Sequence, residues 1–310
     1  LSFGEKFYPF ELMGFNRCAD QLDLTGGQNL RVAKQSFHVQ SDEDVTVYAM
    51  SQALTTSDAF LVLPTDALGN SYYVMSYPAD ASSTSTGETP SQFAIVATED
   101  STIVNITTDE PIYRFGRVPA NVRLNKGEVY LVQSQVRGIG RYVDLTGTLV
   151  ESTKPIALFS GHQRATIPIE DDSRSSRDCL IEQMTPINTW GRGALVVPYP
   201  EPSDAEVFTG DKYRILAAYD STEVYIDSVY ALTLNAGQFY EADLNRAHAV
   251  LATRAVMVAQ FKHTSSIRQN GGSPNRLGDP FMMMIPPSSQ FLKSYRFVNV
   301  QAAKTNALGN

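Results

Sequence analysis

The sequence predicts an all-β protein built from three related multi-strand units, with no substantial helix. Two observations support this prediction. Short segments rich in β-branched and aromatic residues, bounded by Gly, Pro, Asn or Asp, recur along the chain, and no stretch of about twelve residues shows helical periodicity. In addition, one long stretch occurs twice. The clearest strand-like segments are Val45–Tyr48, Phe60–Leu63, Tyr72–Met75 and Val129–Val132.

The duplicated stretch has an alternating pattern. The first copy, Phe93–Ile106, has the sequence FAIVATEDSTIVNI, and the second, Tyr213–Ile226, has YRILAAYDSTEVYI. Alternation with a period of two places one face of a strand on a core. In each copy an Asp-Ser pair, Asp100-Ser101 or Asp220-Ser221, lies between two such runs, where side-chain oxygens can cap a tight turn. We therefore predict a β-hairpin with its apex at each pair.

Further repeated features set the boundaries of the units. An L-N-x-G turn and a hydrophobic run follow each copy, and Val45–Ala49 aligns with those two runs. A proline-led marker precedes each unit, and Phe3-Gly4 resembles its second half. The markers are Pro64 with Leu68-Gly69, Pro186 with Trp190-Gly191, and Pro287 with Phe291-Leu292. We expect Trp190, Tyr72 and Tyr73 to be core residues, and Met282–Met284 to form a buried strand.

These markers predict one cooperative assembly over residues 1–310. Its units are an abbreviated first unit at about 3–67, a second at 68–189 and a third at 190–290, followed by a strand at 291–300. That last strand either closes onto the first unit or begins a continuing array. The sequence leaves open whether the arrangement is propeller-like or a set of packed β-sandwiches.

Composition excludes several classes of function. Of the 310 residues, 43% are hydrophobic and 10% aromatic, which is typical of a folded globular protein. The formal net charge of −8 argues against a nucleic-acid partner. No run of about eighteen apolar residues occurs, so we expect no membrane span. The chain begins with Leu1, which suggests a mature form or an excised fragment.

No pattern of residues indicates catalysis or a metal centre. The four histidines have no H-x-x-x-H spacing, and the chain lacks a G-x-S-x-G elbow, a P-loop and C-x-x-C pairs. The adjacent acids at Glu99-Asp100 and Asp171-Asp172 are not the separated pair that a glycosidase needs. The oxygen-rich segment Glu170–Asp172 would suit Ca²⁺, but it lacks the D-x-D-x-D-G pattern. We therefore expect no enzyme activity, no catalytic residues and no cofactor.

Candidate binding residues lie where the chain departs from the repeat, because functional residues on β scaffolds are concentrated in loops. The loop at 167–178 mixes acidic and basic residues, and the loop at 198–211 is acidic and contains proline. His162 follows the terminal strand of the second unit, at the position of Lys262 in the third. The candidate ligand-binding residues are His162, Arg164, Asp171, Asp172, Arg174 and Asp204.

The chain as a whole resembles the N-terminal domain family of the IgGFc-binding protein, in particular its bacterial secreted or surface members. The resemblance covers nearly everything between His38 and Phe297, in order. It depends on these stretches: Val45–Tyr48, Asp58–Val74, Ser91–Thr102, Leu124–Tyr130, Asp144–Thr148, Lys154–His162, Glu182–Met184 and Asp279–Pro287.

This resemblance implies a non-enzymatic extracellular recognition or adhesion module, secreted or attached to a cell surface, whose partner is a glycoprotein or glycan. The alternative is a structural spacer or tip module of a surface fibre, within a larger multidomain or oligomeric protein. Family members usually carry a cysteine shortly after the Gly-His motif, where this chain has Arg164. The resemblance therefore implies that Cys179 pairs with Cys18 in a disulfide.

Overall fold

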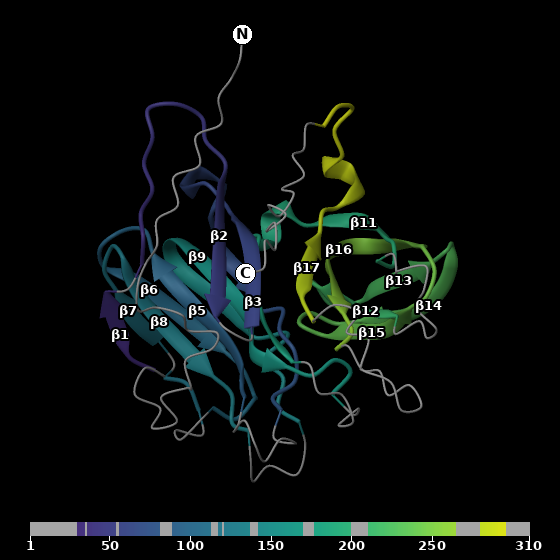
Figure 1. Cartoon of the computed structure of the whole chain (residues 1–310), viewed down its shortest axis with the longest axis horizontal. Helices are drawn as coiled ribbons and strands as arrows, with labels where there is room; N and C mark the ends of the chain where they lie inside the picture. The colour runs from purple at the N-terminus through teal and green to yellow at the C-terminus, as the bar shows by residue number, and fades with distance from the viewer. Residues whose placement is uncertain are drawn as a thin grey trace, which may run out of the picture.

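The computed structural model is an all-β structure, as the sequence predicts. It describes residues 30–34, 36–53, 56–80, 89–112, 117–119, 121–136, 142–169, 177–199, 210–264 and 280–295. Within these residues every regular element is a strand or a short 3-10 turn, and none is an α-helix. The strands form two bodies that lie side by side, one in purple to teal and one in green to yellow (Figure 1). No described helix is long and apolar enough to cross a membrane.

The first body is an eight-stranded antiparallel sheet centred on β9 (Leu149–Ala165). Two strands pair along one edge of β9 and two along the other, and further strands extend the sheet outward. Its other members are β1 (Val32–Lys34), β4 (Gly69–Tyr73), β5 (Ser91–Ala97), β6 (Thr102–Thr107), β7 (Asn121–Leu124), β8 (Glu128–Gln133) and β10 (Asp178–Gln183). We call the body from β4 to β10 the second unit.

The second body repeats this plan around β16 (His248–Lys262), with the same order of strands along the chain. Its other members are β11 (Gly191–Val196), β12 (Asp211–Ala217), β13 (Thr222–Ile226), β14 (Val229–Leu234), β15 (Phe239–Leu244) and β17 (Met282–Ile285). We call this body the third unit. In each body the two halves of the long strand, β9 or β16, pair with different strands, so one long strand holds the whole sheet together.

The predicted hairpins at Asp100-Ser101 and Asp220-Ser221 are wrong. The turns exist, with positive φ at Ser101 and Ser221, but β5 and β6 pair with different halves of β9 and not with each other. The same holds for β12 and β13 on β16. Alternation in the sequence predicted the strands but contained no information on their partners. In each unit both strands pair with the long central strand, β9 or β16.

The recurring D-S-T and L-N-x-G motifs are explained by two hydrogen bonds that join their turns, which we call the lock between turns. In the second unit, Lys126 N donates to Asp100 Oδ1 (3.0 Å) and Ser101 N donates to the side-chain oxygen of Asn125 (3.2 Å). The third unit repeats both bonds, from Ala236 N to Asp220 and from Ser221 N to Asn235, at the same two distances. These motifs are therefore structural.

The proline markers are explained by contact between successive units. Each marker proline precedes a 3-10 turn: η1 (Thr65–Ala67), η2 (Ile187–Thr189) or η3 (Ser288–Gln290). A Cβ atom on Gly69 would lie 2.6 Å from Pro186 Cβ, and one on Gly191 would lie 2.3 Å from Pro287 Cβ. The glycine of one marker therefore leaves room for the proline of the next.

The two units share a hydrophobic core. Side chains of the second unit, including Tyr72 and Phe93, pack in one cluster with Met257 and Phe261 of the third, while the third unit also has a smaller core of its own. Tyr72 and Tyr73 are buried as predicted, and Trp190 is half-buried against this cluster. Met282–Met284 lies in strand β17, but of these three residues only Met282 is buried.

A buried cation links the units. Arg214 on β12 is 2% exposed, and its guanidinium pairs with Glu241 of its own unit (2.8 Å) and with Asp144 of the second (2.7 Å). It also donates to the carbonyl of Ser76 at 2.8 Å. Burial alone would lower the pKa of Arg214, but the two carboxylates outweigh it and raise the pKa, so the charge is retained.

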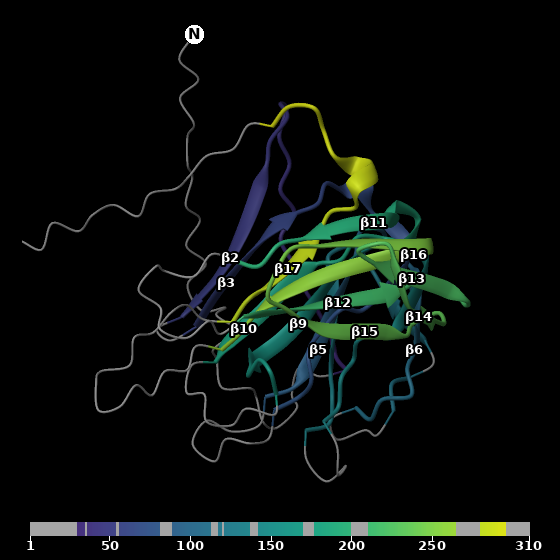
Figure 2. The same ribbon diagram turned by 90° about the vertical axis from the view of Figure 1, so that its right-hand side faces the viewer.

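The described part of the first unit attaches to the second. Strand β1 pairs with β8, and the hairpin of β2 (Val47–Ala53) and β3 (Thr56–Val62) lies beside β10, as Figure 2 shows. At the other end, residues 291–295 form no strand, and 296–300 lie outside the described residues. The division into one cooperative three-unit assembly with a closing strand stays a prediction.

Candidate functional site

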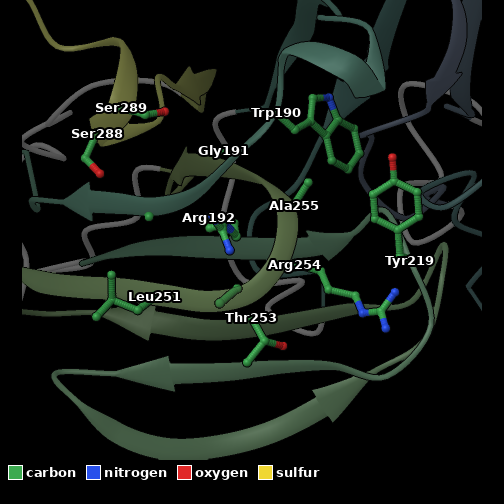
Figure 3. Close-up of a pocket in the computed structure, with 12 residues that line it drawn as sticks. Trp190, Gly191, Arg192, Tyr219, Leu251, Thr253, Arg254, Ala255, Ser288 and Ser289 are labelled. Carbon is green, nitrogen blue, oxygen red and sulfur yellow. The ribbon is translucent and has the colours of Figure 1, made fainter.

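An open groove of about 840 Å³ lies on the third unit, where β11 and β16 separate below η3 (Figure 3). Its lining combines two aromatic rings, two arginines, three hydroxyl-bearing residues and small or aliphatic residues. The lining residues are Trp190, Gly191, Arg192, Gly193, Tyr219, Leu251, Ala252, Thr253, Arg254, Ala255, Ser288 and Ser289. No acidic side chain is among them.

The groove is formed by an irregularity in strand pairing. Gly191 is opposite Val256 and Gly193 is opposite Leu251, so the single residue Arg192 faces the four residues 252–255. At this point β16 bends, because up to Ala252 it pairs with β13 and from Val256 onward it pairs with β12. Such irregularities redirect side chains and are frequent beside binding sites. Here the irregularity includes Thr253 and Arg254, which are exposed, and Ala252 and Ala255, which are half-buried.

The aromatic side chains lie toward one end of the groove. Trp190 is held in place, because its indole N–H donates to the carbonyl of Thr185 (3.1 Å) and its ring lies 6.0 Å from that of Tyr73. Tyr219, in the turn between β12 and β13, is 47% exposed. In Figure 3, Trp190, Tyr219 and Arg254 are toward this end, while Ser288 and Ser289 are toward the other.

The two arginines give the groove its charge. Arg192 and Arg254 are both exposed, and neither forms an ion pair with any residue that the structure describes. The nearby acids are otherwise bonded: Asp220 accepts the N–H of Ala236, and Glu223 accepts the hydroxyl of Tyr225 at 2.8 Å. The lining of the groove thus carries two cations and no anion, on a chain whose formal net charge is −8.

The equivalent surface of the second unit is different. Its strands have the same irregular pairing, with Gly69 opposite Ile156 and Ser71 opposite Glu151. The positions of Arg192, Tyr219, Leu251 and Arg254 are taken there by Asn70, Glu99, Glu151 and Lys154. Lys154 Nζ lies 3.5 Å from the Glu99 carboxylate and donates to the carbonyl of Asp100 (2.7 Å). In this unit the cation is neutralised within the protein.

His162, which was predicted to contact a ligand, is buried in the second unit. Burial, reinforced by Arg177 and opposed by Asp80, lowers its pKa to about 4, so the ring is neutral at neutral pH. Its Nδ1 accepts the backbone N–H of Arg164 (3.0 Å). The structure therefore places His162 in the interior, fully buried within β9, and its role in ligand binding stays a prediction.

The other predicted binding residues are partly described. Arg164 is half-buried and its Nε donates to the carbonyl of Arg177 (3.3 Å), so it too stabilises the interior of this unit. Asp171, Asp172, Arg174 and Asp204 lie outside the described residues, and their roles stay predictions.

The predicted disulfide is not tested. Cys179 is buried on β10, and its N–H donates to the hydroxyl of Thr56 on the hairpin at 2.9 Å. Cys18 lies outside the described residues, so the Cys18–Cys179 bridge stays a prediction. Among the described residues, no group of three His, Cys, Asp or Glu side chains could hold a metal ion.

Sequence reasoning missed the groove. Trp190 was assigned to the core as part of a marker, and the two arginines were not singled out. A signal was available in the repeat itself, since comparing the units position by position shows Tyr219 in place of Glu99 and Leu251 in place of Glu151. What the sequence alone did not provide was the irregular pairing that brings these positions together.

Comparison with known proteins places the chain in a family. The family described as IgGFc binding protein matches residues 58–308. This chain belongs to that family. The predicted family resemblance is therefore confirmed.

The human IgGFc-binding protein is 23% identical to this chain over 286 residues, which is 90% of the chain and 5% of the human protein. The chain therefore spans about a twentieth of the length of this relative. No solved structure matches it.

Proposed function

We propose that this chain is a non-enzymatic extracellular recognition module that binds a glycoprotein or glycan through the groove on its third unit. Membership of the IgGFc-binding family supports an extracellular, protein-binding role. The observation that carries the proposal is the composition of the groove: Trp190 and Tyr219, two arginines and several hydroxyls converge on one exposed surface.

These side chains suit a carbohydrate or a glycosylated surface. Aromatic rings such as that of Tyr219 provide a large apolar face with a polar edge, on which the C–H face of a sugar packs. Tyr, Trp and Arg are also the residues enriched in the energetically important centres of protein interfaces. The hydroxyls of Ser288 and Ser289 are exposed at the other end, where they can donate to and accept from sugar hydroxyls.

A glycan array and a pull-down of serum glycoproteins test the proposal, each with wild-type protein and two variants. Tyr219→Ala removes a groove ring, while Glu99→Ala alters the equivalent position of the second unit and is the matched control. We expect Tyr219→Ala to lose binding and Glu99→Ala to retain it. Absence of binding to every glycan and glycoprotein at high protein concentration would overturn the proposal.

Because the human relative is named for binding IgG Fc, the pull-down includes Fc as one glycoprotein. Native Fc and Fc stripped of its glycan are compared directly. Binding to native Fc alone supports recognition through the sugar. Equal binding to both forms would show that the contact is with the Fc polypeptide, so that Fc is not a glycan-dependent partner.

A second candidate function, a spacer module of a surface fibre, is favoured by the hairpin. In the sequence repeat, β2 corresponds to the C-terminal halves of β9 and β16, and each of those halves is paired along both edges. Among the described residues, β2 pairs only with β3. Tyr48 and Met50 on β2 are 74% and 69% exposed. A spacer would pair such an edge with another unit. Sedimentation over a range of concentrations tests this: end-to-end association supports the spacer, and a monomer that binds glycans contradicts it.

A further inference from the structure

We propose that the groove is selective for anionic sugars and takes a carboxylate or sulfate group between Arg192 and Arg254. This inference rests on the proposed function, since it names the ligand class of the same groove. It follows from three properties of the described residues: the absence of acids in the lining, the positions of the two guanidinium groups, and the contrast with the second unit.

The first property is uncompensated charge. Two guanidinium groups line one groove without a carboxylate among the twelve lining residues. Guanidinium groups present several N–H donors in a planar fork that fits carboxylate and sulfate oxygens, and such charge-assisted bonds are stronger than neutral ones. On a chain with an acidic net charge, a small positive groove favours a compact anion over a long polyanion, which the rest of the surface repels.

The second property is the position of each arginine. Arg192 occupies the irregularity in β11, opposite the bend that carries Arg254, so the two residues line the groove from opposite strands. Figure 3 shows Arg192 near the centre of the groove and Arg254 below Tyr219. An anion bound here lies beside an aromatic ring, and the ring and the anionic group of one acidic sugar can be held together.

The third property is the contrast with the second unit, which serves as an internal reference. There the equivalent positions hold two carboxylates and one ammonium group, and Lys154 is paired with Glu99. In the third unit both carboxylates are replaced, by Tyr219 and Leu251, and a second cation is added at Arg192. Since the backbone pairing is the same, the change removes the carboxylate partner of the cation without altering the strand pairing.

The test measures binding of three matched probes: lactose, 3′-sialyllactose with its carboxylate, and 3′-sulfated lactose. Isothermal titration at low and at moderate salt compares wild type with Arg192→Gln, Arg254→Gln and the control Lys154→Gln. We expect both acidic probes to bind at least about tenfold more tightly than lactose, and each arginine variant to weaken them about tenfold. Lys154→Gln should bind like wild type. The circular dichroism and melting temperature of every variant are checked first.

The outcomes are distinct. Equal affinity for lactose and the acidic probes, or undiminished binding by folded arginine variants, would overturn the anionic selectivity while leaving glycan recognition in place. Binding of one acidic probe alone supports the inference and identifies carboxylate or sulfate as the group. Tighter binding to a DNA oligonucleotide than to either probe would overturn it in favour of a polyanion. If no glycan binds in any assay, the proposed function fails and this inference fails with it.

Discussion

The second and third units have the same strand order, the same lock between turns and the same marker contact, but they differ at the bend of the long strand. In the second unit Glu99 lies beside Lys154, and in the third Tyr219 takes the place of Glu99, so that Arg254 has no ion-pair partner among the described residues. The shared residues fix backbone hydrogen bonds and close contacts, whereas the groove residues that differ at this bend, Arg192, Tyr219, Leu251 and Arg254, are exposed. The repeat motif therefore specifies the scaffold, and the site is found where the copies diverge.

The two units also differ at the contact between them, where the third unit contributes a buried arginine. Arg214 occupies the position that Ala94 holds in the second unit, as the registers of β12 on β16 and of β5 on β9 show. Its guanidinium reaches Asp144 of the neighbouring unit and lies over the rings of Tyr77 and Phe239, 4.7 and 4.5 Å from their centroids. This buried cation thus joins the two bodies together with apolar side chains and with the paired hydrogen bonds between Ile167 and Thr264.

The largest expected effect comes from removing that cation. Arg214→Ala leaves the carboxylates of Asp144 and Glu241 without their buried partner, and we expect the free energy of unfolding to fall by about 3 to 5 kcal/mol. Urea denaturation measures this change. Arg123→Ala is the control, because Arg123 bonds only at the exposed surface to Ser101, and its effect should stay within about 0.5 kcal/mol. A loss below about 1 kcal/mol for Arg214→Ala would show that the other contacts between the units hold them together without this cation.

Exchanging Tyr219 and Glu99, which occupy equivalent positions in the two units, tests the difference between the units at the groove. Tyr219→Glu places a carboxylate beside Arg254, as Glu99 stands beside Lys154, and we expect about a tenfold or greater loss of affinity for sialyllactose. The reciprocal Glu99→Tyr frees Lys154 and should create weak, salt-sensitive binding on the second unit. Titration of both variants with the same probe measures the change. Retained affinity in Tyr219→Glu would contradict a role for the uncompensated charge of Arg254.

Removing one hydrogen bond from the lock between turns should lower the stability equally in both units. Asn125→Ala and Asn235→Ala each remove one hydrogen bond of 3.2 Å, to Ser101 N and Ser221 N, and we expect each to cost about 1 kcal/mol. Thermal and urea denaturation of the two variants, measured side by side, provide the check. Clearly unequal losses would mean that the repeated bonds do not have the same role in the two copies.

Much of this scaffold was predictable from the sequence. The period-two alternation of Phe93–Ile106 predicted its strands, and the proline markers predicted where units meet, because both patterns arise from local geometry. Pairing was not predictable in the same way. Whether β5 pairs with β6 or with β9 depends on contacts between distant residues, and the Asp-Ser turns are compatible with either arrangement.

The site was less predictable than the fold. His162 was a candidate because it follows the hydrophobic run of the second unit, but its side chain is fully buried. Arg192 and Arg254 lie sixty-two positions apart and come together only because β16 bends opposite Gly191 and Gly193. Composition and motif spacing do not predict such a bend. The substitution of Tyr219 for Glu99, however, was visible when the repeats were compared.

The smallest expected effect concerns two carboxyl groups at the hairpin. Burial, with a contribution from Asp178, raises the pKa of Asp58 from 3.8 to about 7, against the opposing N–H groups of Ile181 and Ala59. Burial and then Asp58 raise the pKa of Glu182 from 4.5 to about 8. The third unit has Met283 at the position of Glu182, so this pair has no copy there.

The folded protein therefore holds protons more tightly than the unfolded chain between about pH 4 and 8. The stability contributed by the two carboxyls is fully present below their ordinary pKa values and is lost as pH rises through about 7 and 8. Glu182→Gln removes one titrating group, and we expect its melting temperature to fall less than that of wild type between pH 5 and 8.5. Met283→Gln, the matched change in the third unit, should keep the wild-type slope. Identical slopes in Glu182→Gln and wild type would show that the buried carboxyl of Glu182 does not titrate in this range.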